Sequence, residues 1–438
     1  MTALAFIIGV VLLVVGLAVS IALHEIGHLV PAKLFGVRVS RYMIGFGPTI
    51  WSRRFGETEY GFKALPLGGY IAMSGMYPPS PGADPAAPAA TGRAGGGFFA
   101  TMVQDARAAN DETLVAGDTK PAFYQLPVWK RIVIMLGGPV MNLLFSMVLF
   151  GIALSAIGVP VATTTIAAVN ECVLPSGADR ETCAAGDPTS PAAAAGIRPG
   201  DVIVSVGGTP VSSFAEATAI IQDAPGRSLP VVVERDGAEQ TLSVTPISAE
   251  RTFATEDGGS RTAEVGFVGM TAALGYEPQP IWSGPEAALE RTGAVASVMW
   301  QLPVRIYDTA VTTITGNERD PNGPLSVVGA GRIAGELAAT EAPILDRASM
   351  LIGLLASLNI ALFVFNLLPL LPLDGGHVVV ALWDGLKRSW AKLFRRPPPR
   401  PVDATRLVPV TFAVFIGLVV MGGVLIIADV VNPIAILG

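Results

Sequence analysis

The chain has 438 residues, of which 51% are hydrophobic and only 15% are charged, and its formal net charge is −6. This composition is too apolar for an ordinary soluble protein and indicates a protein embedded in a membrane. The acidic balance argues against nucleic acid as a partner, because nucleic-acid-binding surfaces are basic.

Four segments lack Asp, Glu, Lys and Arg over a length that crosses a bilayer, which takes roughly 20 apolar residues. They are residues 3–23, 132–158, 348–373 and 407–428. We interpret all four as transmembrane helices, within membrane segments 1–32, 131–159, 348–380 and 407–430. A cleavable signal peptide is the alternative for the first, although no basic residue precedes it and no small-residue cleavage pattern follows it.

The charges between these spans predict their orientation. Residues 160–347 carry 11 Arg, no Lys and 23 Asp or Glu, whereas residues 381–406 carry 7 Lys or Arg against 2 Asp. Residues 31–130 carry 10 Lys or Arg against 7 Asp or Glu. Positive charge in short loops marks the cytoplasmic side. We therefore expect a plasma-membrane protein with both termini and the acidic region outside, and with 33–130 and the basic loop 381–406 in the cytoplasm.

The region 33–130 begins with VSRYMIGFGPTIWSRRFGETEYGFKALPLGGYIAMSG. Its apolar and aromatic residues are interrupted by glycines, which indicates short β-hairpins associated with the membrane. Residues 78–97 are then rich in Pro, Gly and Ala. We expect a flexible insertion over 78–119 that has no core of its own.

Residues 160–248 predict a compact α+β module. The expected elements are a strand at 202–206, a short strand at 210–211, a helix at 214–223 and two strands around the Asp236-Gly237 turn. The stretch AGIRPGDVIVSVGG makes the module resemble a PDZ domain, a class that binds extended peptides at a sheet edge. A structural β-module with a blocked groove is the alternative.

The rest of the acidic region allows three further expectations. Cys172 and Cys183 favour a disulfide in an oxidising compartment, with two unpaired thiols as the alternative. Within 249–347, residues 287–314 predict an amphipathic helix on the outer leaflet, kinked at Pro303, and a fifth, poor span is the alternative. The stretch NGPLSVVGAGRIAGE contains too many glycines for an assignment.

Two of the three histidines, His24 and His28, flank Glu25 in the sequence HEIGH at the end of the first span. Residues four apart share one helix face, so both imidazoles can bind one zinc ion while the glutamate takes a proton from water at the metal. Ionisable groups in a membrane helix are costly and normally functional. A helix end in the headgroup layer, where polar residues are ordinary, is the alternative.

A catalytic zinc site takes three protein ligands and keeps one position open. Asp374 and His377, in LLPLDGGH, are the only Asp, Glu or His within the third span or at its inner end. On the expected topology the first and third spans both run inward, so these residues lie at the depth of His24 and His28. The spacing does not choose between Asp374 and His377 as the third ligand.

These motifs in this order make the chain resemble the site-2 protease family of intramembrane zinc metalloproteases. It is most similar to the bacterial proteases that cut membrane-bound anti-sigma factors, particularly the actinobacterial branch. The stretches GFGP, YGFKALPLGGY and GGPVMNLLFS match further blocks of that family. The similarity extends over nearly the whole chain, apart from the insertion 78–119 and the loop 171–183.

The resemblance implies one Zn²⁺ ion per chain. It makes Asp374 the third ligand beside His24 and His28, His377 a neighbouring supporting group, and Glu25 the base.

The resemblance also implies residues that hold the substrate. Asn366, and less closely Asn359, would bind the substrate backbone, with ordinary hydrogen bonding between helices as the alternative. Gly68 and Gly69 would lie in a re-entrant hairpin whose edge pairs with an unwound substrate strand, with a plain turn as the alternative.

The expected protein is therefore a polytopic α-helical membrane protein with about four transmembrane helices, a membrane-associated β-hairpin region and an extracytoplasmic PDZ domain. The implied activity is site-2 cleavage of single-pass membrane proteins such as anti-sigma factors, and of remnant signal peptides, after a first extracytoplasmic cut. A PDZ scaffold with a vestigial metal site is the main alternative. A metal transporter is a weaker one, because it would need polar residues along several spans.

Overall fold

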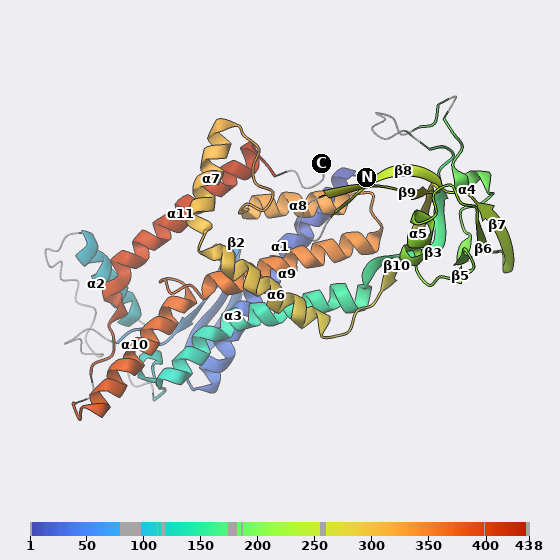
Figure 1. Ribbon diagram of the computed structural model, residues 1–438. Helices are drawn as coiled ribbons and strands as arrows, with labels where there is room; N and C mark the ends of the chain where they lie inside the picture. The colour runs from blue at the N-terminus through green and yellow to red at the C-terminus, as the bar shows by residue number, and fades with distance from the viewer. Residues whose placement is uncertain are drawn as a thin grey trace. The chain divides into compact units, whose positions relative to one another are not determined.

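The computed structural model describes residues 2–78, 98–111, 113–114, 119–173, 182–184, 187–254, 260–397 and 399–434. The chain divides into two compact units, whose elements are drawn in Figure 1. The first, called here the helical unit, comprises Met1–Ile157 and Gln279–Gly438. The second, called the β unit, comprises Gly158–Pro278.

Four helices of the helical unit are long and apolar enough to cross a membrane, judged by length and composition over the described residues. They are α1 (Thr2–Leu34), α3 (Val128–Gly151), α9 (Ile344–Asn366) and α11 (Val408–Val431). A π-helical turn, η2 (Ile152–Ile157), extends α3. These helices match the four spans expected from the sequence and give a polytopic helical membrane protein.

The third span is shorter than expected. Helix α9 ends at Asn366, and a separate helix, α10 (Asp374–Leu393), begins eight residues later. The prediction of one helix over 348–380 is therefore wrong. Pro369 and Pro372 lie in the gap, and proline supplies no backbone N–H and clashes with the preceding turn. The break leaves Asp374 in the first turn of a new helix.

Three more helices follow the β unit in the chain. The segment expected as one kinked helix at 287–314 forms α6 (Ser283–Met299) and α7 (Leu302–Thr315), which separate just before Pro303. The glycine-rich stretch left unassigned forms α8 (Val327–Ala339). Small residues let α8 pack closely on α1, since a Cβ on Gly9 would collide with the Ala334 carbonyl.

A buried ion pair ties the end of α11 to the segment before α8. Arg319 Nη1 lies 2.5 Å from Asp429 Oδ1, and both side chains are 2% exposed. The second carboxylate oxygen of Asp429 accepts a hydrogen bond of 2.7 Å from the Ser326 backbone N–H. The carboxylate is thus paired and hydrogen-bonded, as a charge removed from water requires.

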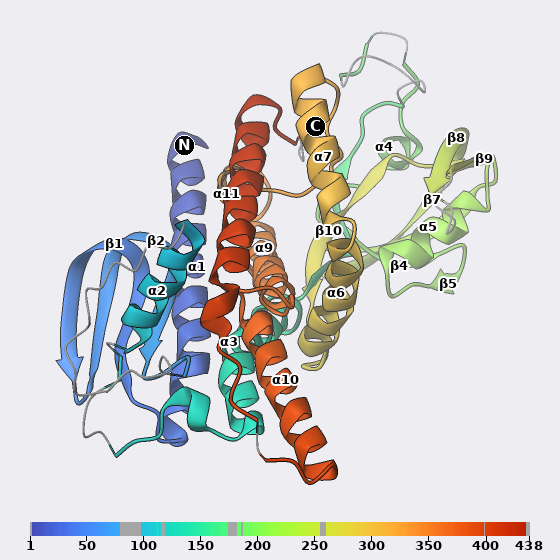
Figure 2. The same ribbon diagram turned by 90° about the vertical axis from the view of Figure 1, so that its left-hand side faces the viewer.

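Two long antiparallel strands, β1 (Val39–Phe55) and β2 (Thr58–Met73), bend to form a sheet beside α1 (Figure 2). Because of the bend, Met43 of β1 pairs with Tyr70 on one side and with Gly61 on the other. Residues 69–73 therefore form an edge of the sheet, paired on one side only within the described part of the chain.

The insertion expected at 78–119 contains a helix, α2 (Phe98–Asp111). Arg107 Nη2 lies 2.5 Å from Asp403 Oδ2, and Asn110 exchanges two hydrogen bonds of 3.0 Å with the Tyr77 backbone. Residues 98–111 of the insertion therefore form a helix that polar contacts join to Tyr77 and Asp403. Residues 79–97, 112 and 115–118 of the insertion lie outside the described residues. Short 3-10 turns, η1 (Phe123–Gln125) and η3 (Ala404–Leu407), precede α3 and α11.

The β unit contains an antiparallel sheet with the strand order β10-β3-β4-β6-β7, in which the short strand β5 also pairs with β4. Its strands are β3 (Val159–Val169), β4 (Val202–Val206), β5 (Thr209–Pro210), β6 (Leu229–Arg235), β7 (Ala238–Val244) and β10 (Met270–Glu277). A separate pair is formed by β8 (Ile247–Ala254) and β9 (Ser260–Phe267), and the helices are α4 (Pro191–Ala194) and α5 (Phe214–Gln222). The elements at 202–244 lie where the sequence predicted them, within two residues.

The interior of the β unit is apolar, and a disulfide closes one of its loops. Ile203, Val206 and Val233 from β4 and β6 are fully buried together with Ala217 of α5. Cys172 and Cys183 form a disulfide, so the alternative of two unpaired thiols is wrong.

Asp201 fixes the turn that leads into β4. It accepts hydrogen bonds from Arg235 Nε at 2.7 Å, from Arg235 Nη2 at 2.8 Å and from the Arg198 backbone at 2.8 Å. The Arg235 guanidinium holds the pKa of the Asp201 carboxyl below its ordinary value. Such a carboxylate stabilises the fold above its unfolded pKa of about 3.9, and the contribution is lost as the pH falls through the folded-state pKa.

We expect Asp201→Asn to reduce the protection of β4 and β6 amides from hydrogen exchange by on the order of tenfold at neutral pH, because the charged acceptor is lost. The difference from the wild type should shrink as the pH falls below about 4. Hydrogen-exchange mass spectrometry of the full chain measures this difference in protection, with labelling times adjusted so that the intrinsic exchange of an unprotected amide is equal at every pH. The exposed Glu239→Gln on β7 is the control, and a difference that stays constant with pH contradicts the prediction.

Candidate metal centre

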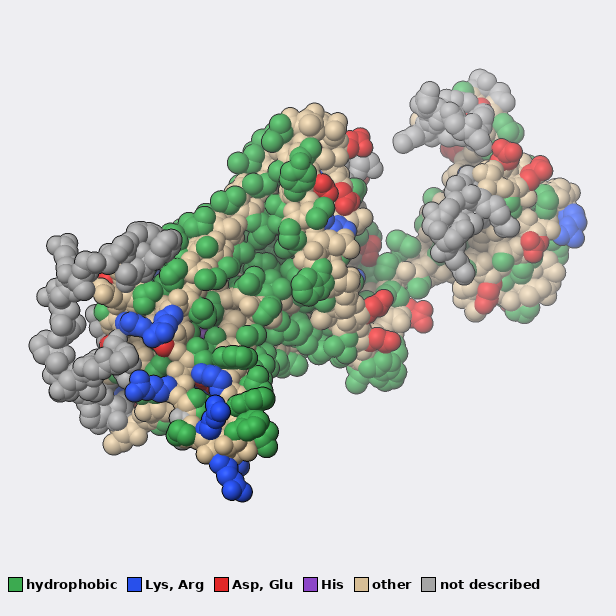
Figure 3. Space-filling view, turned by 60° about the vertical axis from the view of Figure 1, so that its left-hand side comes forward, with side chains coloured by type: hydrophobic (Ala, Val, Ile, Leu, Met, Phe, Trp, Pro, Cys, Tyr) green, Lys and Arg blue, Asp and Glu red, His purple; other side chains and the backbone are tan. Residues whose placement is uncertain are grey.

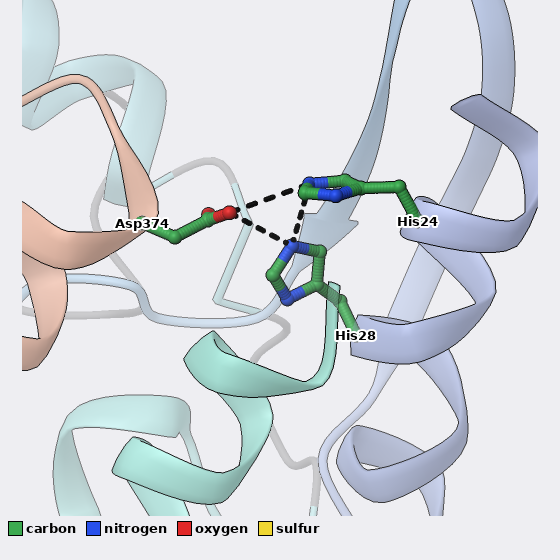
Figure 4. Close-up of side chains that lie close together, drawn as sticks. All are labelled: His24, His28 and Asp374. Atoms are coloured by element: carbon green, nitrogen blue, oxygen red, sulfur yellow. Dashed lines mark hydrogen bonds and ion pairs between the residues drawn. The ribbon is translucent and has the colours of Figure 1, made fainter. Parts of the chain in front are cut away.

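His24 and His28 lie one turn apart on α1, and their Nε2 atoms are 3.2 Å from each other. Asp374, in the first turn of α10, points its Oδ2 between them (Figure 4). This oxygen lies 3.3 Å from His24 Nε2 and 3.4 Å from His28 Nε2. Residues 346 positions apart in the chain thus meet at one point, as the common depth of the two segments predicted.

The three atoms have the spacing that a zinc ion requires. Ligand atoms about 2.0–2.1 Å from a tetrahedral Zn²⁺ lie roughly 3.3 Å from one another. Asp374 Oδ2 is buried and has no hydrogen-bond partner among the described residues. A buried carboxylate oxygen without a partner is costly, and a bound cation would remove that cost. Two imidazoles and one carboxylate are a common donor set for catalytic zinc, with the fourth position left open.

Backbone and side-chain partners on α3 orient both imidazoles. His28 Nδ1 donates a hydrogen bond of 2.7 Å to the Ile134 carbonyl, which leaves the Nε2 lone pair free for a metal. His24 Nδ1 lies 3.3 Å from Nδ2 of the Asn142 side-chain amide. A His24 that binds a metal through Nε2 carries its proton on Nδ1 and needs an acceptor there, which Asn142 supplies when its amide group is turned so that Oδ1 faces the ring. This arrangement also gives Asn142 Oδ1 the partner that it otherwise lacks among the described residues.

We expect Asn142→Leu to lower zinc affinity by roughly 10–100-fold, because His24 loses the group that fixes its ring and tautomer. Competition with a chelator of known affinity measures this on purified protein. Asn142→Asp, which keeps an acceptor oxygen, should retain most of the affinity. Equal affinity in Asn142→Leu and the wild type would show that this amide does not orient His24.

Close approach of α3 to α1 brings these partners within reach. A Cβ on Gly27 would collide with the Gly137 carbonyl, and a Cβ on Gly138 would collide with His28 Nε2. Only glycine leaves space at these positions, so the two backbones meet beside the site.

Glu25 faces the sheet edge. The residue is 7% exposed, and a Cβ on Gly69 of β2 would lie 2.9 Å from Glu25 Cγ. Tyr42 of β1 also lies near it and donates a hydrogen bond of 2.8 Å to the Ala22 carbonyl. Burial, and next the charge of Glu25, raises the pKa of Tyr42 to about 12, so this hydroxyl stays protonated. Glu25 is thus buried one residue from His24, with its side chain against the strand edge that carries Gly69.

The other residues named from the sequence occupy different positions. His377 lies one turn beyond Asp374 on α10 and stacks on the Tyr77 ring at 6.2 Å, outside the triad. Of the two candidates for third ligand, the structure therefore brings Asp374 to the histidines. Asn359 is fully buried and donates to Ser20 Oγ on α1 at 2.9 Å, a hydrogen bond between helices.

Asn366 and Gly68 lie at element ends or bends. Asn366 is the last residue of α9, and its side chain makes no hydrogen bond within the described part of the chain. Gly68 has φ +94°, and its Cα faces the Phe46 ring across the sheet.

The sequence reasoning missed Asn142, Gly138 and Tyr42. Asn142 carried a signal, because it is a polar residue in an otherwise apolar span. The stretch GGPVMNLLFS that contains it resembles a block of the family, but the resemblance implies no role for Asn142. Gly138 and Tyr42 carried no comparable signal, since their function depends on which element packs against α1.

A family model described as Peptidase family M50 matches residues 12–395. The chain belongs to this family, the site-2 proteases. The M50 assignment makes it a zinc metalloendopeptidase of the plasma membrane and agrees with the donor set on α1 and α10.

Relatives of this M50 peptidase match most of its length. Zinc metalloprotease Rip1 of Mycobacterium bovis is 36% identical over 442 residues, which is 98% of each chain. Zinc metalloprotease Rip1 of Mycolicibacterium smegmatis is 35% identical over 455 residues, again 98% of each. Metalloprotease MmpA of Caulobacter vibrioides is 27% identical over 88% of each chain.

Proposed function

We propose that this M50 peptidase cleaves single-pass membrane proteins of the anti-sigma-factor type, and remnant signal peptides, within the bilayer after a first extracytoplasmic cut. His24, His28 and Asp374 hold one zinc ion per chain, and Glu25 is the general base. The observation that carries the proposal is that His24 and His28, on a 33-residue helix apolar enough to cross a membrane, meet Asp374 of α10 at zinc spacing.

When bound, zinc supplies a Lewis acid that polarises the scissile carbonyl and lowers the pKa of water. Glu25 takes the proton of the attacking water and delivers it to the departing amine nitrogen. Its position supports both steps, because Glu25 is buried next to His24 on α1 and its side chain lies against the strand edge at Gly69. His28 and His24 keep their Nε2 atoms toward the metal through the Ile134 carbonyl and Asn142.

The sheet edge at residues 69–73 supports a way of holding an unfolded substrate segment. A helix in lipid hides its peptide bonds in hydrogen bonds four residues apart, so cleavage needs a locally extended backbone. The edge offers main-chain donors and acceptors to such a strand, and Gly69 contacts the Glu25 side chain. Asn366, with its amide free of partners among the described residues, is proposed to hold the substrate chain on the other side, and Asn359 to assist it.

We further propose that residues 160–248 are an extracytoplasmic PDZ domain that excludes substrates with bulky outer domains. The order of β4, β5, α5, β6 and β7 after the GIRPGD turn supports the PDZ assignment. The 23 acidic residues and absence of lysine in 160–347 support the outer location, and the basic loop 381–406 supports a cytoplasmic one for itself.

Quantitative proteomics of membrane peptides tests the substrate class. Cells that carry Glu25→Gln in place of the wild type should accumulate single-pass fragments that have lost their outer domains. The PDZ scaffold alternative predicts no accumulation and no stoichiometric zinc in the purified protein. Accumulation of intact polytopic proteins instead of trimmed single-pass fragments would refute the proposed class.

A further inference from the structure

Helix α10 carries an exposed apolar stripe from Leu382 to its end at Leu393. Leu382, Trp383, Leu386, Trp390 and Leu393 are each more than half exposed. Their spacing of three, four and seven residues places them on neighbouring faces of one helix. The opposite side packs against the helical unit through Ala381, Asp384 and Ala391, which are buried.

Contacts with α3 place this stripe at the level of the lipid headgroups. Asp384 Oδ2 accepts a hydrogen bond of 3.0 Å from Arg131 Nη1 in the first turn of α3, and both side chains are buried. Trp129, beside Arg131, is 57% exposed. Helix α10 therefore passes the end of a membrane-crossing helix at Asp384, and its later residues lie where aromatic and basic side chains gather at a bilayer surface.

A groove of about 470 Å³ opens beside the stripe. Its walls are Trp383 and Trp390 on α10 and Pro397 and Pro399 in the chain that returns along the helix. The return begins where the Arg396 backbone N–H donates 2.8 Å to the Ala391 carbonyl. Lys387 and Arg396 add charge to these apolar walls.

The charge of this region is strongly positive. Lys387 Nζ lies 3.3 Å from Asp384 Oδ1, and the same carboxylate also forms an ion pair with Arg131. One negative charge is therefore shared by two positive ones. Arg388, Lys392, Arg395 and Arg396 make no ion pair within the described part of the chain. Figure 3 shows Lys and Arg side chains gathered among hydrophobic ones at this end of the helical unit.

We propose that the groove binds the headgroup of an anionic phospholipid. Lys387 and Arg396 contact the phosphate, while Trp383 and Trp390 lie against the glycerol and the upper acyl chains. The charge complementarity selects an anionic lipid over a zwitterionic one, and the apolar stripe requires a ligand that is apolar below its headgroup. The inference depends on the helices spanning a bilayer and not on the proposed substrate class.

The test uses the full-length protein in phosphatidylcholine nanodiscs that contain a minor fraction of phosphatidylglycerol with brominated acyl chains, which quench nearby tryptophan fluorescence. The fluorescence of the two groove tryptophans is the difference between the tryptophan fluorescence of the wild type and that of Trp383→Phe/Trp390→Phe. We expect brominated phosphatidylglycerol to quench this fluorescence several-fold more than the same fraction of brominated phosphatidylcholine. Lys387→Gln/Arg396→Gln should remove the excess, and the charge-preserving Lys387→Arg/Arg396→Lys should restore it.

Arg53→Gln/Arg54→Gln is the matched control, because both arginines are exposed on β1 and away from α10, and it should retain the excess quenching. Equal quenching by the two lipids in the wild type would overturn the proposal. So would an excess that survives in Lys387→Gln/Arg396→Gln. Displacement by free glycerol phosphate in the buffer would assign the groove to a soluble anion and overturn the lipid site.

Discussion

Glu25→Gln should abolish cleavage of a single-pass membrane substrate while the purified protein keeps its zinc. General-base catalysis contributes roughly 10²–10⁴-fold to rate, and glutamine has the shape of glutamate but cannot accept the proton. The zinc should remain because its expected donors are His24, His28 and Asp374. Cleavage in proteoliposomes and metal analysis of the same preparation measure the two effects together.

The control for this variant is Glu290→Gln, which removes one carboxylate from an exposed position on α6 of the same unit. It should cleave at the wild-type rate. Full proteolysis by Glu25→Gln would refute Glu25 as the base. Loss of zinc along with activity would instead give Glu25 a place among the ligands.

Asp374→Asn should release zinc, because the only negatively charged donor of the triad is lost and two neutral imidazoles remain. We expect affinity to fall by at least roughly 10–100-fold, and cleavage to fall with it. His377→Gln is the informative partner, since His377 lies one turn away on the same helix but stacks on Tyr77. It should keep stoichiometric zinc. Zinc loss in His377→Gln with retention in Asp374→Asn would exchange the roles of the two residues.

The sequence predicted the essential part of the site because helical spacing is a local property. His24 and His28 share a face whatever packs beside them, and charge patterning set the depth at which Asp374 would join them. The spacing alone does not choose between Asp374 and His377, because the choice depends on where α10 begins, and only the family resemblance favours Asp374. Pro369 and Pro372 indicate a helix break, but the uncharged segment that contains them also fits one continuous membrane span.

Tertiary packing decided the remainder. Asn142 reaches His24 only because Gly27 and Gly137 let α1 and α3 approach, a contact that no periodicity encodes. Helix α8 has a glycine-rich sequence that favours a loop by propensity, yet its small residues fit against α1. Helix α2 is fixed by Arg107 and Asp403, which are far apart in the chain. Propensity therefore failed where contact partners were distant in sequence.

X-ray absorption spectroscopy of the zinc-loaded protein tests the metal site most directly. We expect one zinc per chain with nitrogen and oxygen ligands at about 2.0–2.1 Å, an imidazole signature from His24 and His28, and no sulfur. His24→Ala/His28→Ala should lose the metal. A sulfur ligand at about 2.3 Å, or full zinc occupancy in the doubly substituted protein, would contradict the site formed by α1 and α10.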